Sequence, residues 1–155
     1  AAGILKYINE LSLFTNSTVN SYSRLNAIFT STSVAWSTEE CSQIIRISDD
    51  EGDYPVVLKT SDCVCNPYFV FGLLIYAAIE GIESSLELPP ENSDVNLPKN
   101  LFEAVEISKK SEFLKKYLPQ NILDSIINQS EAEWKEFSLT YDKDAFEEQK
   151  YFYNL

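Results

Sequence analysis

The chain has 155 residues, a net charge of −12, three cysteines and no histidine. So acidic a chain is unsuited to nucleic acid and to anionic membrane surfaces, which bind clustered lysine and arginine. The odd cysteine count argues against a disulfide framework, and the lack of histidine removes the commonest general base and metal ligand. A single domain in a reducing, cytoplasmic compartment is therefore expected.

The chain begins inside a helical pattern. Apolar side chains recur at helical spacing from Ile4 to Leu11 and predict a helix over residues 2–14. Because a natural protein rarely begins inside an element, we expect a piece of a longer protein. No signal-peptide pattern is seen. Residues 16–25 are polar and are predicted to form a loop that carries Arg24.

Three short strands are predicted next, over residues 33–36, 43–47 and 55–60. The acidic segment 48–53 contains a glycine and is predicted to be a turn, so the last two strands should pair as a hairpin. A calcium site in this turn is disfavoured, because its carboxylates lack the alternating spacing of a calcium loop.

Residues 61–82 form the predicted centre of the fold. Asn66 is the expected N-cap of a helix, and Pro67 fits its first turn, where a missing N–H costs nothing. Residues 69–79 carry no charge, so other elements are expected to cover this helix on nearly all sides. The run is too short to span a bilayer. Gly81 is the expected stop, since glycine readily adopts the left-handed conformation.

The remaining residues are predicted to form one loop and a series of acidic helices. The loop covers residues 88–100, and the helices cover residues 101–107, 111–118, 119–137 and 143–153. In the longest helix, Trp134 is expected to face inward and Glu133 to face water. The aromatic residues Tyr151, Phe152 and Tyr153 either cover the chain's own core or dock on another subunit.

Strands followed by helices predict an α+β fold. Residues 1–155 are expected to form a single domain, with a strand-rich half and its core helix at 1–85 and a helical half at 86–155.

Several ordered motifs resemble those of glutamine synthetases. N-S-T-V-N-S-Y-S-R-L at 16–25 resembles the family's N-P-T-x-N-S-Y-x-R-L, and residues 35–47 resemble its W-S/G-x-x-N-R-S-x-x-x-R-I strand pair. Residues 61–68 resemble its R-x-P-D-x-x-x-N-P-Y turn. Gly-Ile at 81–82 and G-I-L-K at 3–6 resemble the family's A-G-x-x-G-I and G-L-L-K-H. The resemblance is strong over the first half and weaker to about residue 140.

This resemblance implies the C-terminal part of the family's catalytic domain. The expected architecture is a set of antiparallel strands from a glutamine-synthetase-like sheet or barrel, packed by a buried core helix and C-terminal helices. The family's enzymes are ATP-dependent glutamate–ammonia ligases that use Mg²⁺ or Mn²⁺ and assemble into rings. Metal ions and arginines serve that chemistry because the phosphoryl group in transfer carries dispersed negative charge.

The resemblance also implies roles for individual positions. Arg24 falls on an arginine that contacts substrate glutamate, and Arg46 falls on an arginine near the nucleotide phosphates. Lys59 replaces a substrate-binding arginine and keeps its charge without the planar fork. Val57 stands where the family has a metal-ligand glutamate, so no metal ligand is expected there. Cys41 stands where an arginine near the phosphates is expected.

Each of these positions also has a structural interpretation. Arg24 and Arg46 could be ion-paired arginines of an acidic protein, and Lys59 could extend along a strand edge to solvent. Cys63 and Cys65 are better read as two small thiols than as a zinc site, since zinc needs four ligands. The family's loop glutamate that closes the ammonia site has no counterpart in residues 26–32.

Two functional interpretations follow. The chain is predicted to be incompetent alone for ligation and to act as a non-catalytic ligand-binding or interaction subunit that binds no cofactor by itself. Alternatively, it is an excised piece of an active, divergent glutamine synthetase that needs its upstream half, with ATP and Mg²⁺ or Mn²⁺ as the implied cofactors. In either case a homo-oligomer or a complementing N-terminal half is the expected partner, because uncovered sheet edges and apolar helices promote association.

Overall fold

The computed structural model describes residues 1–28, 33–39, 43–48, 52–91 and 95–152. Seven helices and three strands lie in these ranges. In chain order they are α1 (Ala2–Thr15), α2 (Val19–Ile28), β1 (Trp36–Ser37), β2 (Ile45–Ile47), β3 (Val56–Leu58), α3 (Pro67–Glu83), α4 (Leu101–Lys110), α5 (Glu112–Tyr117), α6 (Gln120–Leu139) and α7 (Lys143–Tyr151). The mixed helix and strand content confirms an α+β fold. No helix within these ranges is both long enough and apolar enough to cross a bilayer.

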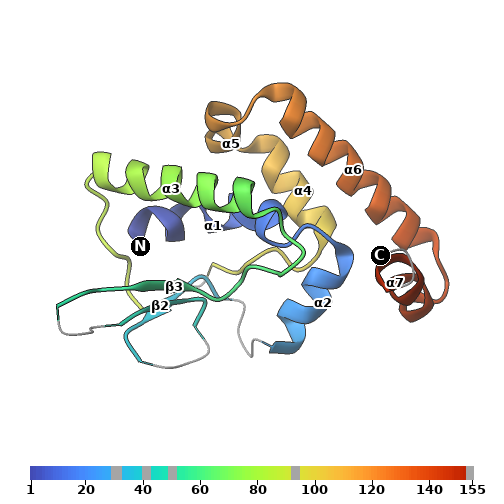
Figure 1. The fold of residues 1–155 in the computed structure, drawn as a ribbon, viewed down its shortest axis with the longest axis horizontal. Coiled ribbons are helices and arrows are strands. Elements are labelled where there is room, and N and C mark those ends of the chain that lie inside the picture. Colours follow the sequence, from blue (N-terminus) through green and yellow to red (C-terminus); the bar gives the residue numbers. More distant parts are fainter. Residues whose placement is uncertain (29–32, 40–42, 49–51, 92–94, 153–155) are drawn as a thin grey trace.

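Helix α1 lies between the sheet and α3 (Figure 1). Its Leu5 and Ile8 pack in one apolar cluster with Ile44 and Ile45 of the sheet region. A second, larger cluster joins the far end of α1 to the other helices, and its buried members include Leu11, Leu13, Phe14, Leu73, Leu101, Leu114 and Leu123. The predicted first helix is therefore confirmed, and its apolar positions serve two cores.

The segment predicted as a polar loop is helical from Val19, so that prediction is wrong. Val19, Tyr22 and Leu25 recur every three residues and are all buried. Serine and asparagine between them have modest helix propensity, but tertiary packing of an apolar face outweighs propensity in short helices. Arg24 consequently lies on a helix.

The sheet has the order β1-β2-β3. Strands β2 and β3 pair antiparallel, with Arg46 opposite Val57, which agrees with the predicted pairing. Strands β1 and β2 pair parallel, so the expectation of antiparallel strands throughout is wrong at this edge. Parallel pairing requires the chain to return between the two strands, and part of that connection lies outside the described residues. Within the described residues the sheet is open, with β1 and β3 at its edges.

Helix α3 begins as predicted. The side chain of Asn66 accepts a hydrogen bond from the Tyr68 N–H at 3.0 Å, and Pro67 occupies the first turn. The helix continues past Gly81 to Glu83, and the residue with a left-handed backbone is Ser85, at φ +49°. The prediction of Gly81 as a helix stop is therefore wrong.

Gly81 has a packing role instead. A β-carbon on Gly81 would lie 2.7 Å from the backbone nitrogen of Gly3, and one on Gly3 would lie 2.0 Å from the Ala77 carbonyl oxygen. These two glycines allow the backbones of α1 and α3 to touch, which no larger residue permits.

The expectation that α3 is covered on nearly all sides is also wrong. Its inner face is buried against the rest of the chain through Val70, Leu73, Ala77 and Gly81. Its opposite face carries five exposed apolar side chains, which we call the outer stripe: Tyr68, Phe71, Ile75, Ile79 and Ile82.

Helices α4 to α7 lie at the other end of the molecule from the sheet (Figure 1). Their bounds agree with the predicted helical segments within a few residues. Helix α6 buries Leu123 and Ile127, and α7 docks on it through Phe137 and Phe146, whose rings meet edge to face at 5.5 Å. Tyr151 donates a hydrogen bond to Glu133 at 2.5 Å, so Glu133 does not simply face water.

Candidate functional site

Arg24 lies at the junction of four segments. Its Nε donates to Asp62 at 3.3 Å, and its Nη2 donates to the Asn16 side chain at 3.1 Å and to the Thr60 carbonyl at 2.9 Å. Asn16 ends α1, Thr60 follows β3 and Asp62 precedes α3. One guanidinium thus holds these three segments against α2.

Asp62 is the acidic partner in this cluster and is only 8% exposed. Burial alone would raise the pKa of the carboxyl group. Hydrogen bonds from Ser21, from the Val64 N–H and from Cys63, together with the nearby charge of Arg24, outweigh burial and lower the pKa of Asp62. Asp62 is therefore ionised at neutral pH, and the Arg24–Asp62 contact is a partly buried ion pair.

Arg46, Val57 and Lys59 share one face of the sheet. Arg46 and Val57 are direct cross-strand partners, and such partners point to the same side. Lys59 follows Val57 by two residues, and strand residues two apart share a face. The opposite face carries Ile45 and Leu58, which belong to the cluster beneath α1. The family's expected metal-ligand position is thus an aliphatic side chain beside an arginine.

The predicted site residues lie in two neighbouring groups: Arg46, Val57 and Lys59 on the sheet face, and Arg24 with its hydrogen-bond partners. Arg46 lies opposite Val57, and Lys59 directly precedes the Thr60 carbonyl that Arg24 binds. Cys41 and residues 29–32 lie outside the described residues. Within the described ranges, no group of three or more His, Cys, Asp or Glu side chains could hold a metal ion.

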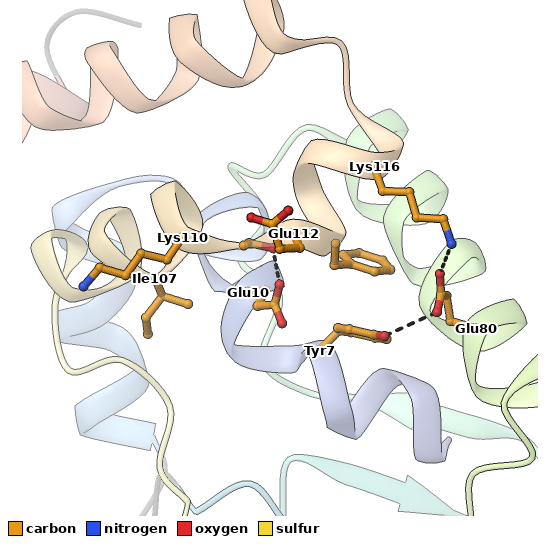
Figure 2. A pocket seen from close by; sticks show the side chains of 9 residues that line it. Tyr7, Glu10, Glu80, Ile107, Lys110, Glu112 and Lys116 are labelled. Atoms are coloured by element: carbon orange, nitrogen blue, oxygen red, sulfur yellow. Dashed lines mark hydrogen bonds and ion pairs between the residues drawn. The ribbon is translucent and has the colours of Figure 1, made fainter.

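A second cluster, around Glu80, was not anticipated from the sequence (Figure 2). Glu80 of α3 accepts hydrogen bonds from Tyr117 at 2.6 Å, from Tyr7 at 3.4 Å and from Lys116. The hydrogen bond from Lys116, followed by that from Tyr117, lowers the pKa of Glu80 to about 2. The one feature of the sequence that could have indicated this cluster is Glu80 itself, a charged residue that directly follows the uncharged run 69–79.

The Glu80 cluster borders an open pocket of about 590 Å³ between α1, α3, α4 and α5. Figure 2 shows Tyr7 and Lys116 both directed at Glu80, while Glu10 on the far side accepts a hydrogen bond from Ser111. The carboxylates of Glu80 and Glu10 already bind donors of the chain itself. Their arrangement ties α1, α3 and α5 together.

Comparisons with known proteins bear on the residues that the family motifs indicate, Arg24, Arg46, Val57 and Lys59. The family model for the catalytic domain of glutamine synthetase matches residues 1–149. The glutamine synthetase of Methanosarcina mazei is 33% identical over 153 residues, which cover 87% of this chain and 34% of the relative. That of Thermotoga maritima is 32% identical over 168 residues, which cover 97% of this chain and 38% of the relative.

Two solved structures have a similar fold. The crystal structure of a novel glutamine synthase homolog gives a TM-score of 0.80 at 22% identity, over 95% of this chain and 36% of that one. Ligand-free GmaS gives a TM-score of 0.73 at 24% identity, over 97% of this chain and 36% of that one. The chain spans about a third of the length of the curated relatives it matches, and it corresponds to their C-terminal part.

Proposed function

The chain belongs to the glutamine synthetase family. We propose that this C-terminal segment of a catalytic domain does not by itself carry out ATP-dependent glutamate–ammonia ligation. Its role is that of a non-catalytic ligand-binding or interaction subunit. Family membership supplies the expected chemistry, and the residues of the sheet face supply the reason for the departure from it.

The observation that carries this proposal is the pairing of Val57 with Arg46. The family resemblance puts a metal-ligand carboxylate at position 57. A valine side chain has no lone pair, so it cannot bind a divalent cation that would neutralise the transferring phosphoryl group. Loss of one electrostatic contact of this kind costs on the order of a hundredfold or more in rate.

The cationic positions support the same conclusion. Arg24 directs three hydrogen bonds at acceptors of its own chain, which favours a structural role over substrate binding. Lys59 offers a point charge where the family has a planar guanidinium, and only the latter binds a carboxylate in bidentate fashion. Arg46 keeps the family's charge at the position expected near the nucleotide phosphates, so anion binding at this face is the ligand function that we propose.

The second candidate function is that of a divergent but active ligase of which this chain forms one part. The retention of arginine at positions 24 and 46 favours it, because both lie in matched motifs. Under this alternative, the remaining metal ligands and ATP-binding residues come from an upstream half. A cytoplasmic location and assembly into a homo-oligomer or with a complementing half are part of either proposal.

The proposal is tested by assaying the purified chain for glutamine formation with ATP, Mg²⁺, glutamate and ammonia. We expect no glutamine above background. Calorimetric titration of the chain with MgATP or with glutamate should give little heat. A separate titration with inorganic phosphate tests anion binding at Arg46. The matched variant Arg46→Lys should weaken any phosphate binding, since the fork is lost. ATP-dependent glutamine formation by the chain would overturn the proposal.

A further inference from the structure

Cys63 and Cys65 lie two residues apart in the segment that joins β3 to α3. The Cys65 N–H donates to the Asp62 carbonyl oxygen at 3.3 Å, which closes a β-turn. The Val64 N–H donates to Oδ1 of Asp62 at 3.3 Å, and the Asp62 N–H donates to the Thr15 carbonyl oxygen at 2.8 Å. This turn is therefore held by its own hydrogen bonds and by the end of α1.

The turn keeps the two cysteines close enough for a covalent bond. Even in a fully extended chain, the α-carbons of residues two apart are separated by at most about 7 Å, and a turn shortens that separation. The α-carbons of a disulfide usually lie about 4.4–6.8 Å apart. A bond between Cys63 and Cys65 therefore does not require distant segments to come together.

The two thiols differ in their surroundings. Both are free, and Cys63 is exposed whereas Cys65 is partly buried. Burial, followed by the negative charge of Asp62, raises the pKa of the Cys65 thiol, so little of it is thiolate at neutral pH. Val64 between them is 57% exposed, which leaves the turn open to a small molecule. Cys63 is therefore the thiol that an oxidant meets first, and Cys65 is placed to react second.

Metal binding does not account for the pair. Zinc takes four ligands in structural sites, and no group of three or more His, Cys, Asp or Glu side chains in the described part of the chain could hold a metal ion. An accessible thiol beside a second, resolving thiol is instead the arrangement of redox-sensitive cysteines. In reducing compartments, protein disulfides are usually transient and serve such sensing.

We propose that Cys63 and Cys65 form a thiol pair that a small disulfide, such as glutathione disulfide, oxidises reversibly to a disulfide within the turn. The Cys63 thiolate attacks one sulfur of glutathione disulfide, which forms a mixed disulfide and releases one glutathione thiolate. The Cys65 thiolate then attacks the Cys63 sulfur and releases the second glutathione. The two protein thiols are oxidised, glutathione disulfide is reduced to two glutathione molecules, and the two thiol protons pass to them.

Oxidation changes the hydrogen bonding of Asp62. In the reduced chain, the Cys63 thiol donates a hydrogen bond to the Asp62 carboxylate and helps to lower its pKa. A disulfide sulfur has no proton to donate, so this hydrogen bond is lost on oxidation. Nε of Arg24 lies 3.3 Å from Oδ2 of the same carboxylate. The oxidation state of the thiol pair therefore acts directly on the ion pair of Arg24.

The test is mass spectrometry of the folded chain after exposure to glutathione disulfide. A Cys41→Ser background removes the third cysteine and leaves only the two thiols of the turn. We expect the loss of two hydrogen atoms, no retained glutathione, and recovery of both thiols with dithiothreitol. Peptide mapping should place the bond between Cys63 and Cys65 in this background and in the wild-type chain.

Single substitutions in the same background separate the two steps. Cys65→Ser should stop after the first step and retain one glutathione on Cys63. Cys63→Ser should react at least tenfold more slowly, because only the partly buried thiol remains. Serine is close to cysteine in size, so both variants should fold, and circular dichroism verifies this. In an NMR titration, the carboxyl group of Asp62 should have a higher pKa in the oxidised chain than in the reduced chain.

Several results would overturn the proposal. The first is a glutathione adduct that persists on the Cys41→Ser chain while both cysteines of the turn are present. The second is a disulfide-linked dimer in place of the bond within one chain, and the third is the absence of any reaction. An equal pKa of Asp62 in the reduced and oxidised chains would overturn the link to Arg24.

Discussion

The two faces of α3 have similar residue types and opposite surroundings. The inner face packs against α1 so closely that Gly3 and Gly81 bring the two backbones into contact. The outer face carries the exposed row from Tyr68 to Ile82. The hydrophobic composition of α3 predicts cover on nearly all sides, whereas the structure shows that the chain covers only the inner face.

The largest expected difference between the faces comes from truncating one residue on each. Leu73 is 2% exposed and Ile75 is 59% exposed on the same helix. Leu73→Ala should lower the free energy of unfolding by about 2–5 kcal/mol, because it removes buried methyl groups and leaves a cavity. Ile75→Ala should change it by less than about 0.5 kcal/mol. Urea unfolding of the purified chain measures both, and equal effects would contradict the assignment of faces.

The glycines of α3 sharpen the same comparison. Gly81→Ala places a methyl group 2.7 Å from the backbone of Gly3 and should destabilise the chain by about 1–3 kcal/mol. Gly72 is the matched control, since a β-carbon there meets nothing within 4 Å. Gly72→Ala should raise the free energy of unfolding by about 0.5–1 kcal/mol, because alanine favours helix. Thermal unfolding of the two variants should therefore shift in opposite directions.

A smaller effect is expected at the start of α3, which both faces share. The Asn66 side chain accepts the Tyr68 N–H, and Asn66→Ala should cost about 1 kcal/mol of unfolding free energy. Asn66→Asp is the matched variant, because aspartate caps equally well. If the alanine variant unfolds at the wild-type urea midpoint, the cap contributes nothing to stability.

The smallest effect should be visible only as a pH dependence. The pKa of Glu80 falls from 4.5 to about 2 on folding, so the carboxylate stabilises the fold above pH 4.5. That contribution is lost as the pH falls from 4.5 through 2. Glu80→Gln should flatten this part of the stability profile, whereas Glu112→Gln, on the exposed face of α5, should keep it. Urea midpoints across this pH range measure the difference, and coinciding profiles for wild type and Glu80→Gln would contradict it.

The elements that the sequence predicted well are those with local signals. The spacing of apolar residues from Ile4 to Leu11 and the Asn66-Pro67 pair each specify a helix or its start without reference to distant residues. The polar segment around Arg24 lacks such a local signal, because its helix depends on burying Val19 and Tyr22 against other elements. Gly81 looked like a stop, but its role depends on Gly3, 78 positions earlier.

The candidate site was predictable in position and not in its contacts. Family motifs indicated Arg24, Arg46, Val57 and Lys59, and their assigned roles in binding remain predictions. The Arg24–Asp62 ion pair joins residues 38 positions apart, and the Tyr7–Glu80 hydrogen bond joins residues 73 apart. Such pairs arise only when packing brings separate elements together. A motif that indicates one residue of such a pair does not indicate its partner.

We propose that a sheet face with Val57 where the family resemblance expects a metal-ligand glutamate cannot drive phosphoryl transfer. The most direct test is the rate of ATP-dependent glutamine formation by the purified chain, measured beside the intact Methanosarcina mazei enzyme. We predict a rate at background for the purified chain. A rate within tenfold of the intact enzyme would contradict it.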